Sequence, residues 1–208
     1  MKVLLVNGSP NENGCTAAAL TEIEKTLREE QVETERFWLG NQPVSGCMDC
    51  GGCQGTGVCV IDDCVNRFRE KAVAADGFIF GSPVHYASAS GTMTAFMDRL
   101  FFSTPAEVFY LKPAAAVVSA RRAGTTAAFD QLCKYFTISQ MPVIGSRYWN
   151  MVHGAEPAEV QEDAEGLYTM RVLARNMAYF LHCREAAEKL GVPLPKEEPA
   201  VWTNFVRR

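Results

Sequence analysis

Two hydrophobic periodicities alternate along this chain. Short aliphatic runs at residues 2–7, 77–80 and 114–120 have the continuous hydrophobicity of strands buried on both faces. Residues 32–39 alternate between apolar and polar positions, as an outer strand does. Residues 142–148 form a fifth candidate strand. The pattern therefore predicts five strands, with a punctuating Gly-Ser-Pro step after the first and the third.

Helical spacing fills the segments between these strands. Leu20, Ile23 and Leu27 recur at a helical period after Thr16. The last predicted helix has Pro157 in its first turn and a stop signal at Gly191. The other predicted helices lie at residues 65–74, around Met93, Phe96, Met97, Leu100 and Phe101, and around Phe129, Leu132, Cys133 and Phe136.

Strands that alternate with helices and are joined by right-handed crossovers predict an α/β fold. The expected architecture is a doubly wound, five-stranded parallel sheet with the flavodoxin-like strand order 2-1-3-4-5. Residues 1–208 are interpreted as one domain, with a cysteine-rich loop at about 45–64 and a long C-terminal helix. In such a sheet ligands bind outside the carboxyl ends of the strands, so the loops after the first, third and fourth strands are the candidate site.

The composition excludes some classes of partner. With 20 Lys and Arg against 24 Asp and Glu, the net charge of −4 is unsuited to neutralising many phosphates, so we expect no nucleic-acid partner. We expect no membrane partner, because neither the N-terminal segment nor any other apolar run has the length of a signal or spanning segment. Five of the eight cysteines crowd into residues 47–64, which predicts metal or redox chemistry in a reducing, cytoplasmic compartment.

The loop after the first strand, residues 8–16, suits a phosphate group. Ser9 and Thr16 supply hydroxyls, Asn13 supplies an amide, and backbone N–H groups are free where the loop enters a helix. The loop contains neither the Gly-Lys-Ser/Thr step of a P-loop nor the Gly-x-Gly-x-x-Gly fingerprint, and it contains no Lys or Arg. The alternative is an ordinary strand-to-helix turn with an N-cap.

The loop after the third strand, residues 81–91, reads Gly-Ser-Pro-Val-His-Tyr-Ala-Ser-Ala-Ser-Gly. Here the chain resembles the NADPH-dependent FMN reductase and iron-sulfur flavoprotein group, in which a Ser-Pro-Val/Ile-Tyr-Tyr/Trp segment and a Ser/Gly-rich helix entry follow strand three. The resemblance runs from the first strand through residues 147–150. It implies a flavodoxin-like FMN-binding domain in which the first loop holds the flavin phosphate and the second lies along the isoalloxazine ring.

The resemblance also implies which residues contact FMN. Many relatives carry arginine where this chain has Asn11 and an aromatic residue where it has His85. A cation or N–H group beside the pyrimidine side of the ring stabilises the reduced flavin. The alternatives are a surface histidine without a role at position 85 and a solvated basic pair at 121 and 122. The implied FMN-binding residues are Ser9, Asn11, Asn13, Gly14, Cys15 and Thr16; Pro83, Val84, His85 and Tyr86; and Ser119, Arg121, Arg122 and Gly124.

The cysteine-rich loop carries the spacing Cys47-x2-Cys50-x2-Cys53-x5-Cys59. It is similar to the compact motif of iron-sulfur flavoproteins, which implies ligation of a 4Fe-4S cluster by these four thiolates. Two alternatives remain open, a tetrahedral zinc site and free or redox-active thiols. Cys64 is a spare ligand candidate, whereas Cys15, Cys133 and Cys183 are expected to be packing residues.

The resulting hypothesis is an FMN-dependent NAD(P)H oxidoreductase. FMN accepts a hydride from NAD(P)H and passes electrons to a second acceptor such as a flavin, a quinone, a metal ion or an iron-sulfur partner. Since the cofactor carries the chemistry, no side chain is assigned a catalytic role. The alternatives are an iron-sulfur flavoprotein electron carrier and a thiol-based redox or metal sensor. Residues 93–101 form a wide apolar stripe at the position where members of the resembled family build their subunit interface. The resemblance therefore predicts a homodimer or homotetramer.

Overall fold

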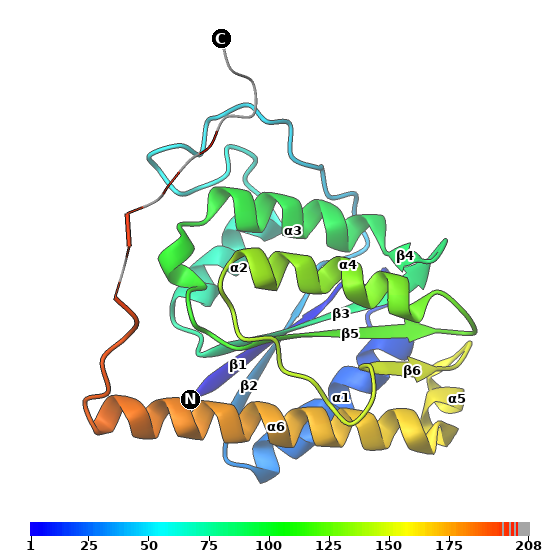
Figure 1. Ribbon diagram of the computed structural model, residues 1–208. Helices are drawn as coiled ribbons and strands as arrows, with labels where there is room; N and C mark the ends of the chain where they lie inside the picture. Colours follow the sequence, from blue (N-terminus) through cyan, green and yellow to red (C-terminus); the bar gives the residue numbers. More distant parts are fainter. Residues whose placement is uncertain (197, 200, 202, 204–208) are drawn as a thin grey trace.

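Five parallel strands run through the centre of the computed structural model, which describes residues 1–196, 198, 199, 201 and 203 (Figure 1). The sheet has the order β2-β1-β3-β5-β6, and a two-residue strand, β4 (Ser88–Ala89), pairs antiparallel with β3. Counted over the parallel strands alone this is 2-1-3-4-5, which confirms the predicted fold class. The strands are β1 (Lys2–Asn7), β2 (Glu33–Trp38), β3 (Gly77–His85), β5 (Ala114–Ala120) and β6 (Met151–His153).

Helices cover both faces of the sheet (Figure 1). The side chains of β1 divide the core, because successive residues of a strand point to opposite faces. Leu4 and Val6 pack in the cluster on the side of α2, α3 and α4, whereas Val3 and Leu5 pack on the side of α1 and α6. The helices are α1 (Cys15–Glu29), α2 (Cys64–Val73), α3 (Gly91–Ser103), α4 (Thr125–Ile138), α5 (Pro157–Glu162) and α6 (Ala164–Lys189), with a 3-10 turn η1 at Ala106–Val108.

The register of the strands decides where the candidate loops lie. Asn7 at the end of β1 pairs with Gly81 of β3, and Pro83 of β3 pairs with Ser119 of β5. Because all three strands are parallel, the segments that follow them lie at one edge of the sheet. The structure thus places the three predicted loops at the same rim, as a shared ligand site requires.

The predicted fifth strand at residues 142–148 is wrong. Val143 forms only an isolated bridge with Ala114, and the chain rejoins β5 eight residues later, where Met151 pairs with Val118. Their partners on β5 are only four positions apart, so the intervening segment loops out of the sheet. Tyr148 and Trp149 are half-exposed in this loop. The fifth parallel strand is instead β6, which begins three residues after the end of the predicted strand.

Two other boundaries differ from the prediction. β3 extends to His85 instead of ending at Phe80, and Pro83 is tolerated within it because β1 pairs with β3 only as far as Gly81. The C-terminal helix divides at Asp163, whose carboxylate accepts a hydrogen bond from the Gly166 N–H and caps α6.

The apolar stripe of α3 is part of the core of this chain. Met93, Phe96, Met97 and Leu100 are fully buried, whereas Phe102 is half-exposed. Oligomerisation through this helix therefore stays a prediction. Within the described residues, no helix combines the length and the apolar composition needed to cross a bilayer.

Candidate functional site

The first loop is shaped by hydrogen bonds at the end of β1. The Asn7 amide donates to the Glu12 carbonyl (2.9 Å) and its oxygen accepts from the Ser9 N–H (3.1 Å). The Ser9 hydroxyl in turn accepts from the Asn11 N–H (3.1 Å). The N-cap of α1 is Gly14, which has no side chain to satisfy the first-turn N–H groups. These N–H groups, at the positive end of the helix dipole, are available to an anion.

Serine hydroxyls join the first loop to the segment after β3. The Gly8 N–H donates to the Gly81 carbonyl (2.8 Å), and the Ser90 hydroxyl donates to the Gly8 carbonyl (2.9 Å). The Ser82 hydroxyl accepts from the Ser90 N–H (2.9 Å), and Ser90 also caps α3. The two segments are thus held in one fixed relation, which gives a ligand a preformed surface.

A single hydrogen bond joins the first loop to the end of β5. Thr16 and Ser119 are both buried, and their hydroxyl oxygens lie 2.8 Å apart, although 103 residues separate them in the sequence. Because either oxygen can donate, the pair can reorient its hydrogens toward a third group.

The three segments border a cavity of about 330 Å³. Its volume is that of a small-molecule site. Nine of the predicted cofactor-binding residues line it: Ser9, Asn11, Gly14, Cys15, Thr16, Pro83, Val84, Ser119 and Arg121. The structure therefore brings together predicted residues from all three segments.

Five predicted residues do not line the cavity: Asn13, His85, Tyr86, Arg122 and Gly124. Tyr86 and Ala87 form the tip of the β3–β4 hairpin, both with positive φ (51° and 59°), and Tyr86 is fully exposed. Gly124 approaches this hairpin closely. With a φ of 96°, it would place an added Cβ 2.7 Å from the Ala87 Cα. Gly124 thus positions the hairpin and does not border the cavity.

A fourth segment lines the cavity and was missed by the sequence reasoning. Gly154, Ala155, Glu156 and Pro157 follow β6 at the same edge of the sheet. The rule that ligands bind beyond the carboxyl ends of the strands could have identified this segment. It did not, because the predicted fifth strand lies too early in the sequence. Glu156 is the one acidic side chain in the lining, and Arg121 is the one basic side chain.

Cys15 borders the cavity as a thiol. Burial is the main effect and raises the pKa of this thiol; a backbone hydrogen bond lowers it by less, and the negative charges of Glu159 and Glu156 add smaller increases. Its Sγ lies 3.5 Å from the Gly154 carbonyl, which it contacts as a weak donor. We therefore expect Cys15 to contribute packing and a weak hydrogen bond rather than a reactive thiolate.

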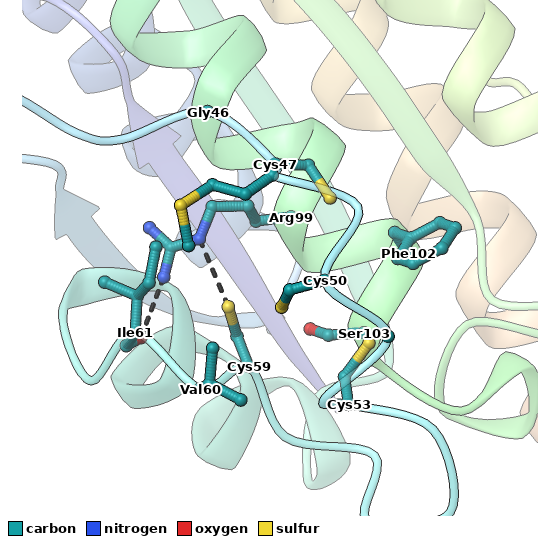
Figure 2. A pocket seen from close by; sticks show the side chains of 12 residues that line it. Gly46, Cys47, Cys50, Cys53, Cys59, Val60, Ile61, Arg99, Phe102 and Ser103 are labelled. Carbon is teal, nitrogen blue, oxygen red and sulfur yellow. Dashed lines mark hydrogen bonds between the residues drawn. The ribbon is translucent and has the colours of Figure 1, made fainter.

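The four cysteines of the predicted metal motif border a second cavity, away from the first. Cys47, Cys50, Cys53 and Cys59 all line it (Figure 2). None of the eight cysteines, all of which lie within the described residues, is in a disulfide. The cavity holds about 20 Å³, roughly the room of one water molecule. Residues 39–63, which include all four of these cysteines, contain no helix or strand.

The donor set distinguishes between metal groups. Among the described residues, no three His, Cys, Asp or Glu side chains are grouped so that they could hold one metal ion. This arrangement disfavours the single-ion zinc alternative, which needs four ligands around one point. A cubane cluster is held by four thiolates. Each binds a different iron, so a cluster does not require its ligands to be grouped around one point.

Arg99 of α3 holds the cysteine loop in place. It is almost fully buried and makes a bidentate ion pair with Asp63 (2.6 and 3.0 Å). It also donates to the Ile61 carbonyl (2.8 Å) and, through Nε, to the Cys59 Sγ (3.3 Å). Burial alone would lower its pKa, but the hydrogen bonds to Asp63 and Cys59 raise the pKa above the ordinary value. The guanidinium is thus a permanent positive charge beside the cysteines.

Sequence comparison agrees with this geometry. The sequence model of the family described as NADPH-dependent FMN reductase matches residues 1–156, three quarters of the chain. The chain belongs to the NADPH-dependent FMN reductase family. The match covers β1 through β6, and so includes every residue that lines the larger cavity except Pro157.

Individual relatives of this FMN reductase family member carry two kinds of name. An iron-sulfur flavoprotein of Methanocaldococcus jannaschii is 32% identical over 188 residues, which cover 86% of this chain and 96% of that protein. An FMN-dependent NADPH-azoreductase of Staphylococcus aureus is 29% identical over 54% of this chain and 57% of its own length. Among solved structures, an archaeal flavodoxin matches with a TM-score of 0.57 and 18% identity, covering 88% of this chain and 99% of that one. The last likeness concerns the fold alone.

Proposed function

We propose that this chain binds FMN in the larger cavity and uses it to pass electrons from NAD(P)H to a second acceptor. The observation that carries the proposal is the convergence of four segments, from the ends of β1, β3, β5 and β6, on one cavity at the carboxyl edge of the sheet. Membership of the NADPH-dependent FMN reductase family and the similarity to an FMN-dependent NADPH-azoreductase support it.

The phosphate of FMN would bind at the first loop. The first-turn N–H groups of α1 and the hydroxyls of Ser9 and Thr16 provide donors, and no basic side chain of this loop is required. Glu156 lies in the same lining and repels an anion, so the N–H groups must outweigh this carboxylate. Binding is therefore expected to depend on oriented dipoles more than on net charge.

The ring of FMN would lie between the end of β3 and the end of β5. Pro83 and Val84 supply apolar contact, and Arg121 supplies a positive charge at the cavity rim. When bound, FMN supplies hydride acceptance from the nicotinamide and electron transfer to the second acceptor. The side chains of this chain orient the ring and stabilise negative charge on it.

Riboflavin provides a direct test of the phosphate site. We expect FMN to bind the purified chain at least about tenfold more tightly than riboflavin, because each hydrogen bond to a charged phosphate contributes about 1.5–3 kcal/mol. Fluorescence quenching of each flavin during titration measures the two dissociation constants. Equal affinity for both flavins would contradict a phosphate site at the first loop.

We propose a 4Fe-4S cluster at the cysteine loop as a second cofactor. Four thiols and the buried Arg99 cation border one cavity there, and the most extensive match among the relatives described above is an iron-sulfur flavoprotein. The motif supplies the four thiolates that such a cluster needs. This cofactor would make one-electron transfer to an iron-sulfur or metal acceptor part of the function.

Iron analysis separates the two cofactor proposals. Chain purified without oxygen is expected to contain about four irons when the cluster is present, and a variant with Ser at positions 47, 50, 53 and 59 is expected to contain none. The same variant should still bind FMN, because the cysteine cavity and the FMN cavity share no residue.

Sedimentation of the loaded protein tests the proposed homodimer or homotetramer.

A further inference from the structure

Helix α3 presents two hydrogen-bond donors to the cysteine cavity from positions one turn apart. Arg99 donates through Nε to the Cys59 Sγ at 3.3 Å. Ser103 also lines the cavity, four residues later along the helix. Figure 2 shows the Ser103 oxygen on the side of the cavity bordered by Cys50 and Cys53. The two donors thus reach different parts of the same cavity.

The Ser103 hydroxyl forms no hydrogen bond within the described part of the chain. The residue is 6% exposed, and its Oγ has no hydrogen-bond partner among the described residues. A buried hydroxyl of this kind is destabilising and calls for an explanation, because nearly all buried polar groups in proteins are hydrogen-bonded. The cavity that it borders is lined by four thiols, so an acceptor that binds there would give the hydroxyl a partner.

We propose that Arg99 and Ser103 donate hydrogen bonds to sulfur atoms of the bound cluster and thereby set its reduction potential. This inference rests on the cluster proposed above. Reduction adds one electron to the cluster and breaks no bond, so the sulfur atoms become more negative. Donors and a fixed positive charge stabilise that form more than the oxidised form. Both residues therefore raise the potential, and they are positioning residues for electron transfer.

The two residues differ in what else they do. Arg99 also anchors the loop through Asp63 and Ile61, so replacing it alters the structure as well as the potential. Ser103 makes no side-chain hydrogen bond among the described residues, so its hydroxyl can be removed without breaking any contact within that part of the chain. Ser103→Ala is therefore the cleaner test.

A neighbouring residue supplies a matched control. Thr104 is as buried as Ser103, and its Oγ1 also has no partner among the described residues, but it does not line the cysteine cavity. Thr104→Val removes this hydroxyl while keeping the shape of the side chain. A general effect of deleting a buried hydroxyl at this end of α3 would appear in both variants.

The experiment is a redox titration of full-length protein purified without oxygen, followed by electron paramagnetic resonance of the reduced cluster. At any fixed electrode potential, Ser103→Ala is expected to shift the ratio of reduced to oxidised cluster about tenfold toward the oxidised form, which is about 59 mV for a one-electron couple. The iron content should match wild type, and the cluster-free protein should be at least as stable as wild type, because the variant removes an unpartnered buried hydroxyl. Thr104→Val should keep the wild-type potential.

Substitutions of Arg99 provide a second test of the reduction potential. Arg99→Lys keeps the positive charge but loses the planar guanidinium with its several N–H donors. It should therefore lower the reduction potential less than Arg99→Gln, which loses the charge as well. A wild-type potential in Ser103→Ala with full iron content would overturn the inference. Wild-type protein that binds FMN but contains no iron would instead overturn the proposed cluster, and this inference with it, while leaving the FMN proposal intact.

Discussion

At the scale of single residues, the hydrogen bond between Thr16 and Ser119 is the most informative contact of the FMN cavity. It joins the first turn of α1 to the end of β5 and is buried from solvent. Sequence reasoning named both residues, because hydroxyls at the ends of parallel strands suit a phosphate or a flavin edge. The hydrogen bond between them could not be predicted, since it depends on the exact register of β1, β3 and β5.

Thr16→Val tests this contact. It keeps the shape of the side chain and removes its hydroxyl, so FMN affinity should fall about tenfold to a hundredfold if the hydroxyl donates to a charged phosphate. Riboflavin affinity should change little. Thr26→Val is the matched control, because Thr26 lies on the same helix and its hydroxyl donates to the Glu22 carbonyl, away from the cavity. Equal losses of FMN and riboflavin affinity in Thr16→Val would contradict the assignment.

Gly124→Ala tests the close approach of the β5–α4 segment to the β3–β4 hairpin. Both the positive φ of 96° and the 2.7 Å approach to Ala87 oppose a Cβ at this position. We expect a loss of about 1–3 kcal/mol in the free energy of unfolding, together with weaker FMN binding. Gly40→Ala is the control. Its φ is 90°, but an added Cβ would find no atom closer than 4.0 Å, so it should cost less and leave FMN binding unchanged. Urea denaturation and FMN titration measure the two effects.

At the scale of elements, long apolar runs were the reliable signals and interrupted ones were not. The buried strands β1 and β5 occupy the predicted residues, because such runs satisfy both faces of the sheet. The fifth strand was misplaced by its aromatic residues, which the structure leaves half-exposed in the loop before β6. Asn150 marks the return to the sheet, where its amide donates to the Ala116 carbonyl (3.0 Å). A side-chain contact of this kind has no counterpart in the hydrophobic periodicity of the sequence, so it could not be predicted.

The break between α5 and α6 yields a stability prediction. One oxygen of Asp163 accepts from the Gly166 N–H (2.9 Å), and the other accepts from the His153 N–H (2.7 Å). Asp163→Ala should lower the free energy of unfolding by about 1–2 kcal/mol, because it removes an N-cap. Asp163→Asn keeps the capping oxygen and should lose less. Denaturant titrations rank the three proteins, and an equal loss in both variants would argue against the capping role.

The ion pairs of Glu35 predict a dependence of stability on pH. Glu35 of β2 pairs with Lys2 of β1 and Lys71 of α2, and these two cations lower the pKa of its carboxyl group against a smaller opposing effect of burial. A lowered folded-state pKa stabilises the protein above the unfolded pKa, about 4.3, and this stabilisation is lost as the pH falls through the folded value. Because the pair is partly exposed, its contribution is expected to be about 1 kcal/mol or less.

Glu35→Gln is the variant that tests this dependence. It should be less stable than wild type at neutral pH, and the difference should shrink as the pH falls below about 4. Glu33→Gln is the control on the same strand, because Glu33 is exposed and forms no ion pair with any described residue. Thermal denaturation across the acid range measures both variants. A difference that stayed constant with pH would contradict the ion-pair account.

At the scale of the whole molecule, the topology could be predicted and the cysteine loop could not. Alternating strands and helices admit few arrangements, so connection rules together with the flavodoxin-like order of five-stranded doubly wound sheets predicted the topology. Residues 39–63 contain no periodic pattern and no helix or strand, so the cysteine spacing could be recognised there but the conformation of the loop could not be predicted. The buried Arg99 that organises this loop comes from α3, far along the chain, and helical periodicity alone would place such a residue at the surface.

The measurement that tests the central claim most directly is anaerobic rapid mixing of the FMN-loaded chain with NADPH, and separately with NADH, while the flavin absorbance is followed. The account predicts prompt bleaching of the bound flavin by at least one nicotinamide, followed by recovery of colour when an acceptor such as a quinone is added. A chain that takes up no FMN, or a bound flavin that neither nicotinamide bleaches, would contradict it.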